Sequence, residues 1–98
     1  MIIRIVELQF TTGSAEKAET LVKNIAPKVR KSEGCHYLDI LIDIHRKGHI
    51  STFSKWESEA HLNAYRDSDL FRNFWGSVKP LFEVPAKAWS SFDAVHLP

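Results

Sequence analysis

Apolar residues alternate with polar ones along four short segments of this sequence, and between those segments they recur at the spacing of an α-helix. Alternation is typical of a half-buried strand, and recurrence every three or four residues is typical of an amphipathic helix. The alternating segments are 2–10, 35–44, 50–56 and 87–95, and the helical segments are 15–32, 59–66 and a stretch that begins after residue 69. This order predicts the ferredoxin-like βαββαβ arrangement of an α+β fold, an antiparallel four-stranded sheet with helices on one face.

Turn and capping residues mark the ends of the predicted helices. Ser14 and Ser58 are of the type that caps helix N-termini, and the break at 67–69 can cap a third helix. Gly34 suits the left-handed backbone that ends the first helix. Pro27 lies inside that helix and removes one backbone hydrogen bond, so we expect a kink there.

The length of the chain limits how it can bury its aromatic side chains. Ninety-eight residues form one domain, which we assign to 1–98. The chain carries three Trp, two Tyr and six Phe, and each such side chain buries ~150–250 Å². A domain this small leaves much of its surface exposed, so we expect a lined pocket, a dimer or both. The face of the sheet that bears Leu41 and Phe92 is expected to pack against a second copy in a two-fold homodimer.

Charge and cysteine content exclude several classes of protein. Thirteen Lys and Arg balance twelve Asp and Glu, for a net charge of +1, whereas a dedicated nucleic-acid binder carries a strongly basic surface. The single cysteine, Cys35, excludes an intrachain disulfide, and we expect it to be a small buried side chain. No apolar run is long enough to span a membrane, and Met1–Val6 lack a signal-peptide pattern. We expect a cytoplasmic protein with no nucleic-acid or membrane partner.

Three segments carry a resemblance to a known family, namely Glu33–His36, Lys55–Leu62 and Asp67–Phe71. In these segments, and in element order from Ile2 to about Phe92, the chain resembles the antibiotic biosynthesis monooxygenase superfamily, especially its quinol-monooxygenase-like members. The resemblance implies a dimeric α/β-barrel that oxidises quinols or polycyclic phenols with oxygen and without metal or flavin. Other members degrade haem, isomerise signalling molecules or have no established activity.

The sequence departs from parts of that family's pattern. The haem-degrading branch has an Asn, a Trp and a ligating His where this chain has Val6, Tyr65 and Trp75. Trp cannot ligate iron, so the resemblance does not extend to haem, and we expect no cofactor. Monooxygenase-like members often carry a His at the position of Tyr65 and another near Asp69, and neither is present here.

Aromatic side chains gather in the segments that would enclose a pocket between helices and sheet. Cofactor-free oxygenation requires an apolar, water-poor pocket, a base, and donors that hold the substrate oxygen. Tyr65 is the best polar candidate, because its hydroxyl can donate to such an oxygen. The alternative is that these side chains form ordinary core. The candidate pocket residues are Phe53, Trp56, Tyr65, Phe71, Phe74 and Trp75.

Histidines and one carboxylate compete for the role of a base. Imidazole titrates near ~6.5 and suits proton abstraction at neutral pH. His36 and His61 are the leading candidates, ahead of His49, while His45 and His96 are expected to be solvated. Glu7 lies among apolar residues and either is functional or forms a salt bridge to an Arg or Lys across the dimer. His45 and His49 with Asp43 lie on a predicted hairpin and make a poor metal site, so we expect no metal.

The sequence leads to one main functional hypothesis and two alternatives. The main one is a cofactor-independent monooxygenase acting on a small aromatic or quinol-like metabolite. In it, Tyr65 orients the substrate, Trp56 and Trp75 enclose it, and His36 or His61 takes a proton. The first alternative is a non-catalytic dimeric domain that binds a small hydrophobic ligand. The second is an isomerase acting on a phosphorylated or keto substrate, which predicts basic residues converging on the pocket.

Overall fold

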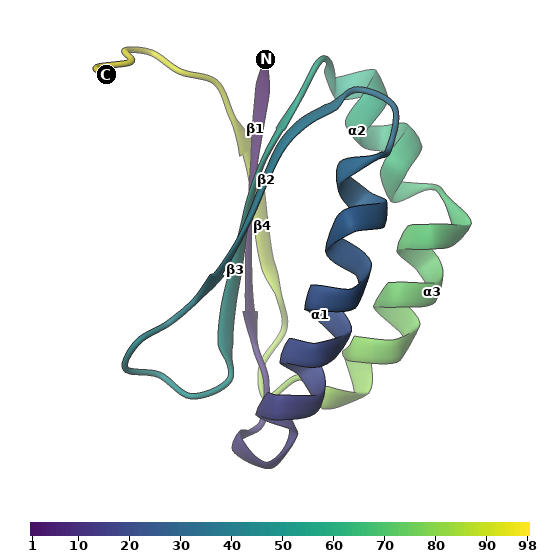
Figure 1. The fold of residues 1–98 in the computed structure, drawn as a ribbon, viewed down its shortest axis with the longest axis vertical. Coiled ribbons are helices and arrows are strands. Elements are labelled where there is room, and N and C mark those ends of the chain that lie inside the picture. Colours follow the sequence, from purple (N-terminus) through teal and green to yellow (C-terminus); the bar gives the residue numbers. More distant parts are fainter.

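A computed structural model describes residues 1–98 and confirms the ferredoxin-like α+β fold. The elements are β1 (Ile2–Gln9), α1 (Ala15–Arg30), β2 (Cys35–Ile42), β3 (His49–Trp56), α2 (Glu59–Arg66), α3 (Asp69–Val78) and β4 (Lys87–Ser91), with 3₁₀ turns at Thr12–Ser14 and Lys79–Leu81. The sheet order is β2-β3-β1-β4, and every neighbouring pair is antiparallel. Figure 1 shows the three α-helices on one side of this sheet, with the C-terminal tail leaving on the other side.

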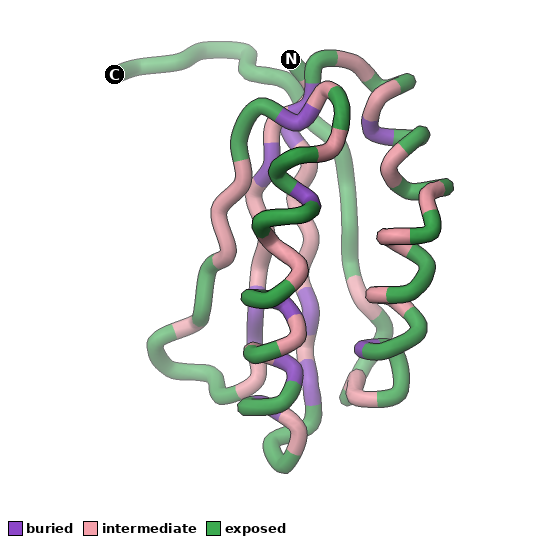
Figure 2. Tube along the Cα trace, turned by 45° about the vertical axis from the view of Figure 1, so that its right-hand side comes forward, coloured by how far each residue is buried: buried purple, intermediate pink, exposed green.

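The pleat of the strands decides which side chains lie under the helices. On β1, Val6 and Leu8 face the helices, where Leu8 packs with Val22 of α1 and Ile50 of β3. A second buried cluster joins Val29, Cys35, Trp56 and Leu62. In Figure 2 the buried residues follow the inner strands and the sheet-facing sides of the helices. The predicted burial of Cys35 is confirmed, with 5% of the residue exposed.

Several predicted ends are corrected by the structure. β4 stops at Ser91 instead of residue 95, because Ser91 already pairs with Ile3, near the beginning of β1, and further pairing partners run out. β2 stops at Ile42, where the Asp43 carboxylate accepts hydrogen bonds from the backbone N–H groups of His45 and Arg46 and turns the chain. α1 ends at Arg30, two residues before the predicted end.

The capping predictions have mixed outcomes. The Ser58 hydroxyl accepts from the His61 N–H, and the Ser68 hydroxyl accepts from that of Phe71, as the sequence predicts. Ser14 makes no capping hydrogen bond. Its backbone already has helical angles at the end of a 3₁₀ turn, whereas a capping side chain needs an extended backbone.

Two sequence features of α1 concern its end and its interior. Gly34 has a φ of +82°, the left-handed conformation predicted for it. α1 continues through Pro27, which is exposed, so water can reach the carbonyl that the missing N–H leaves free. The kink at Pro27 stays a prediction.

No α-helix is both long and apolar enough to cross a bilayer.

Candidate functional site

A cavity of about 530 Å³ lies between the sheet and the helices. This volume is within the range of pockets that bind small molecules, roughly 300–1,000 Å³. Its walls are mainly apolar and come from β1, β2, β3 and β4 on one side and from α1, α2 and α3 on the other. Of the predicted pocket residues, it is lined by Trp56, Tyr65, Phe71, Phe74 and Trp75.

The aromatic side chains of this wall form a continuous chain of ring contacts. Trp56 stacks on Tyr65, with ring centroids 5.0 Å apart, and Tyr65 meets Phe71 edge-on at 5.4 Å. Phe71 stacks on Trp75 at 5.5 Å, and Trp75 meets Phe82 at 5.3 Å. Each ring is therefore held by its neighbours, which keeps the cavity wall in place.

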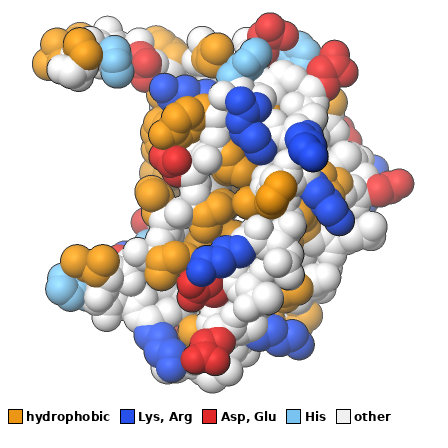
Figure 3. Space-filling view, in the orientation of Figure 1, with side chains coloured by type: hydrophobic (Ala, Val, Ile, Leu, Met, Phe, Trp, Pro, Cys, Tyr) orange, Lys and Arg blue, Asp and Glu red, His pale blue; other side chains and the backbone are white.

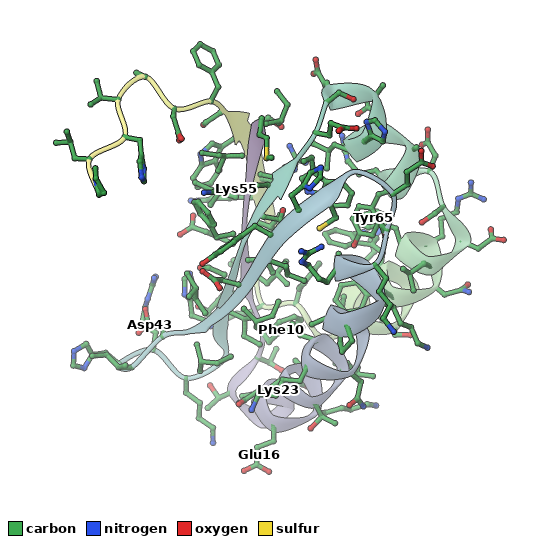
Figure 4. The ribbon with its side chains drawn as sticks, turned by 45° about the horizontal axis from the view of Figure 1, so that its top comes forward. Phe10, Glu16, Lys23, Asp43, Lys55 and Tyr65 are labelled. Atoms are coloured by element: carbon green, nitrogen blue, oxygen red, sulfur yellow. The ribbon has the colours of Figure 1, made fainter.

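Tyr65 supplies a polar group that the protein does not use itself. Its hydroxyl forms no hydrogen bond within the protein, and no fully buried side-chain nitrogen or oxygen is left without a partner, so the hydroxyl keeps some accessible surface. Tyr65 is one of the residues that line the cavity. Burial, with a smaller contribution from the nearby Cys35, raises the pKa of Tyr65 to about 12. The hydroxyl thus stays protonated at neutral pH and can donate a hydrogen bond. Figure 4 shows Tyr65 on the helix side of the sheet.

Trp56 offers the cavity only its ring. Its indole N–H donates to the Ser54 hydroxyl at 2.9 Å, and Ser54 lies at 3.4 Å from the Arg4 carbonyl oxygen, to which it donates. Both residues are buried, at 1% and 5% exposure. The polar end of Trp56 is therefore satisfied within the protein, and the ring serves as a fixed apolar wall.

Phe53 does not line the cavity, which corrects the prediction. It lies on the open face of the sheet, edge-on to Tyr37 at 5.9 Å, with the Lys55 ammonium 5.9 Å from its ring. Alternation along β3 places the small residues Thr52 and Ser54 toward the helices and sends Phe53 outward. Figure 4 shows Lys55 on that same outer side.

The two histidines predicted as bases also lie outside the cavity. A β-bulge lets Cys35 pair with Trp56 and Tyr37 with Lys55, so the extra residue, His36, is turned out to solvent. The His61 ring lies 2.6 Å from the Ser58 hydroxyl oxygen through Nδ1 and 3.5 Å from Glu57 through Nε2. Neither imidazole lines the cavity, so the geometry does not support either as its base.

The remaining titratable candidates meet on the open face of the sheet. His49, only 8% exposed, lies between Glu7 at 3.7 Å and Asp43 at 3.7 Å, and Arg46 approaches its Nε2 at 3.2 Å. Glu7 therefore faces a histidine of its own chain. No group of three or more His, Cys, Asp and Glu side chains is arranged to hold a metal ion.

Two arginines in the cavity wall were missed by the sequence analysis. Arg4 of β1 and Arg66, the last residue of α2, both line the cavity, as does Lys79. A signal for Arg4 was present, because it alternates in phase with Val6 and Leu8 and is thus a charged residue on an inward strand face. Phe82, from the loop before β4, was also missed as a wall residue.

Comparison with known proteins adds a family and a set of related folds. The family model described as antibiotic biosynthesis monooxygenase matches residues 1–76. No curated protein sequence matches the chain. A Nitrosomonas europaea protein, provisionally described as an antibiotic biosynthesis monooxygenase, has a TM-score of 0.90 at 14% identity, covering 97% of this chain and 100% of that one.

Two further solved structures show the same fold. Rv0793 from Mycobacterium tuberculosis has a TM-score of 0.89 at 16% identity, covering 99% of this chain and 98% of that one. PA3566 from Pseudomonas aeruginosa has a TM-score of 0.87 at 19% identity, covering 96% and 94%. Similarity at these identities establishes the fold alone. The family model, in contrast, spans well over half of the 98 residues, and the protein belongs to the antibiotic biosynthesis monooxygenase family.

Proposed function

We propose that the protein is a cofactor-independent monooxygenase that oxidises a small aromatic or quinol-like metabolite with molecular oxygen inside the cavity. The observation that carries this proposal is an apolar cavity of about 530 Å³ lined by Tyr65, whose phenol hydroxyl has no hydrogen-bond partner in the protein. Such a site keeps water from a reactive intermediate and holds the substrate oxygen in place. Membership of a monooxygenase family supports the same chemistry.

The reaction balances with oxygen as the only co-substrate. An ionised phenol or enol passes one electron to oxygen, and the resulting radical pair joins through a C–O bond at a carbon that bears hydrogen. A proton completes the hydroperoxide, replacing the one that the substrate lost on ionisation. Cleavage of the O–O bond, with loss of the hydrogen from that carbon, leaves a carbonyl and releases water. One oxygen atom thus enters the product and the other becomes water.

The roles in this proposal follow from position. Tyr65 donates to the substrate oxygen, while Phe71, Phe74 and Trp75 enclose the ring system and Trp56 backs it. His36 and His61 receive no role, because they do not line the cavity. The substrate instead loses its proton to solvent, before or during entry.

Oxygen consumption with isotope labelling tests the proposal. The purified chain is mixed with 1-naphthol or anthrone under ¹⁸O₂, and uptake is compared with the rate without protein. We expect faster uptake, and one labelled oxygen in the quinone product. Quinone without label would mean simple oxidation, and uptake no faster than in buffer with both compounds would contradict the proposal.

Ligand binding without catalysis is the alternative from the sequence that the cavity itself supports. The space is not filled by Phe74 and Trp75, which lie in its wall. A bare scaffold would close around these rings, whereas an open volume suits a hydrophobic ligand. Tight binding of aromatic compounds with no oxygen uptake would favour this reading.

Isomerase chemistry is supported by one specific observation, the presence of Arg4 and Arg66 in the cavity wall. Such a reaction would rearrange its substrate without consuming oxygen. The oxygen-uptake measurement described above therefore separates it from the monooxygenase.

The location of the protein in the cytoplasm stays a prediction.

We also propose that a second copy covers the open face of the sheet in a homodimer. Tyr37, Leu41 and Trp89 on this side are each 42–50% exposed, and Phe92 in the following tail is 76% exposed. Figure 3 shows hydrophobic side chains along this side and in the projecting tail. Exposed apolar surface of this kind typically marks an interface, and a self-complementary patch closes with two-fold symmetry.

A further inference from the structure

The charged side chains that line the cavity are all cationic. They are Arg4, Arg66 and Lys79, and no Asp, Glu or His lines it. The chain as a whole balances its charges almost evenly. A cavity with mainly apolar walls and only positive charges therefore differs from the rest of the surface, where Figure 3 shows acidic and basic side chains interspersed.

Arg4 and Arg66 lack the acidic partners that Arg46 and Arg72 have. Arg46 lies 3.5 Å from an Asp43 oxygen, and Arg72 lies 3.6 Å from an Asp69 oxygen, whereas Arg4 and Arg66 form no ion pair. The only side-chain hydrogen bond of Arg4 goes from Nη1 to the Ser90 hydroxyl at 3.2 Å. A guanidinium group has five N–H donors, so most of those on Arg4 are free.

The electrostatic setting of Arg4 is unfavourable without an anion. Burial, and then the charge of Arg66, lower the pKa of its guanidinium. A partly buried cation beside a like charge is costly unless a counter-ion joins them. Two guanidinium groups that line one cavity suit the planar oxygens of a carboxylate or the oxygens of a phosphate.

We propose that the cavity takes an aromatic ligand bearing an anionic group, a carboxylate or a phosphate, which Arg4 and Arg66 hold while the aromatic walls enclose the ring. This inference rests on the proposed role of the cavity as the substrate site and names its substrate class. The same two cations also favour the ionised form of a bound phenol or enol, which offsets the absence of a base from the cavity.

Calorimetric titration with matched naphthalene compounds tests the inference. The probes are 2-naphthoate, 2-naphthyl phosphate and the neutral methyl 2-naphthoate, each titrated into the full chain. We expect at least one anion to bind about tenfold or more tightly than the ester, because a hydrogen bond to a charged group contributes more than a neutral one. The tighter of the two anions identifies the acidic group. An ester that binds as tightly as both anions, or three probes that do not bind, would overturn the inference.

Two matched arginine variants test whether the preference for the anion over the ester depends on Arg66. Arg66 is exposed at the end of α2, so Arg66→Gln should fold, and it should abolish the preference for the anion over the ester. Arg72→Gln removes the same charge from a residue outside the cavity and should leave the preference intact. Equal loss in both variants would show a general charge effect and would contradict the site.

Arg4 is tested by a substitution that keeps its charge. Arg4→Lys should retain part of the preference for the anion, because a lysine supplies the charge without the fork of donors, and thermal unfolding checks that β1 is intact. Failure of this inference is separable from failure of the monooxygenase proposal. If the protein prefers the anion, loses this preference in Arg66→Gln and consumes no oxygen, the inference stands and the monooxygenase proposal fails. If it forms labelled product and shows no preference for the anion, the monooxygenase proposal stands and the inference fails.

Discussion

Tyr65 stacks on Trp56 with ring centroids 5.0 Å apart and planes inclined by 24°. The phenol ring of Tyr65, in α2, therefore packs against Trp56, the last residue of β3. The indole N–H of Trp56 is already bonded to Ser54, whereas the hydroxyl of Tyr65 is free. The pair therefore combines a fixed apolar wall with one available donor. This relationship is the basis of the first two predictions.

Removing the Tyr65 hydroxyl should impair function and leave the fold intact. Tyr65→Phe keeps the ring stack and removes a hydrogen-bond donor that has no partner in the protein, so the free energy of unfolding should change little. Oxygen uptake should fall about 10²-fold, the usual effect of losing a donor to a developing oxyanion. Tyr37→Phe is the matched control, because Tyr37 lies on the open face and bonds to Asp39. Unchanged uptake in Tyr65→Phe would remove Tyr65 from the reaction.

Tyr65 should also make the protein less stable at high pH. Its pKa is about 12 in the folded state against 10.0 for an ordinary tyrosine. The contribution of Tyr65 to the free energy of unfolding is fully present below pH 10. It is lost as the pH rises from 10 to 12, because in that range the unfolded chain releases the Tyr65 proton and the folded chain keeps it. A shift of this size corresponds to about 2 to 3 kcal/mol. Urea unfolding at pH 8 and pH 11 should show a smaller loss in Tyr65→Phe than in the wild type, and equal losses would contradict the raised pKa.

Two glycines should respond to alanine in opposite directions. Gly34 has a φ of +82°, and a Cβ there would lie 2.4 Å from Cγ of His61, so Gly34→Ala should destabilise by about 1–3 kcal/mol. Gly76 lies within α3 with no atom near its missing Cβ, so Gly76→Ala should stabilise by about 0.5–1 kcal/mol.

Thermal unfolding compares the two glycine variants. Adding His61→Ala to Gly34→Ala should recover only the part of the loss that comes from Cγ and Cδ2 of the ring, because alanine keeps the Cβ of residue 61, which also clashes with the new Cβ. No recovery would assign the cost to the backbone conformation and to the contact with the Cβ of residue 61, and not to the imidazole ring.

A charge on the open face of the sheet should split the proposed dimer. Leu41→Lys places an ammonium group in the centre of an interface, where charged residues are depleted, and sedimentation should show a monomer. Val84→Lys is the control, because Val84 is similarly exposed, at 48% against 50% for Leu41, but belongs to the loop before β4. A wild-type chain that sediments as a monomer would contradict the homodimer itself.

The periodicity of the sequence predicted the fold because each element repeats one spacing over most of its length. Val6 and Leu8 alternate as a strand requires, and Phe71 and Trp75 recur as a helix requires, so the order of strands and helices along the chain and part of the cavity wall followed. The same rule failed at His36, where a bulge adds one residue and reverses the face.

Phe53 and Arg4 show why the site was predicted less well than the fold. Both faces of this sheet carry large apolar side chains, so polarity could not tell which face of β3 lies under the helices, and Phe53 was placed on the wrong one. Arg4 was not predicted to line the cavity, because charged residues are seldom buried and rarely occupy inward positions of a strand. Whether a partner neutralises such a charge depends on contacts between distant segments, which spacing does not encode.

The hydrogen bond between Trp56 and Ser54 should stabilise the cavity wall measurably. Ser54→Ala leaves a buried indole N–H without a partner, which costs about 1–3 kcal/mol. Ser51 lies on the opposite face of β3, and its hydroxyl does not bond to the Trp56 indole as that of Ser54 does. Ser51→Ala should therefore lower the free energy of unfolding little. Trp56→Phe removes the donor, so Ser54→Ala should cost less in that background than in the wild type. Denaturant unfolding of the four chains measures this coupling, and an additive result would mean that the 2.9 Å contact contributes nothing to the wall.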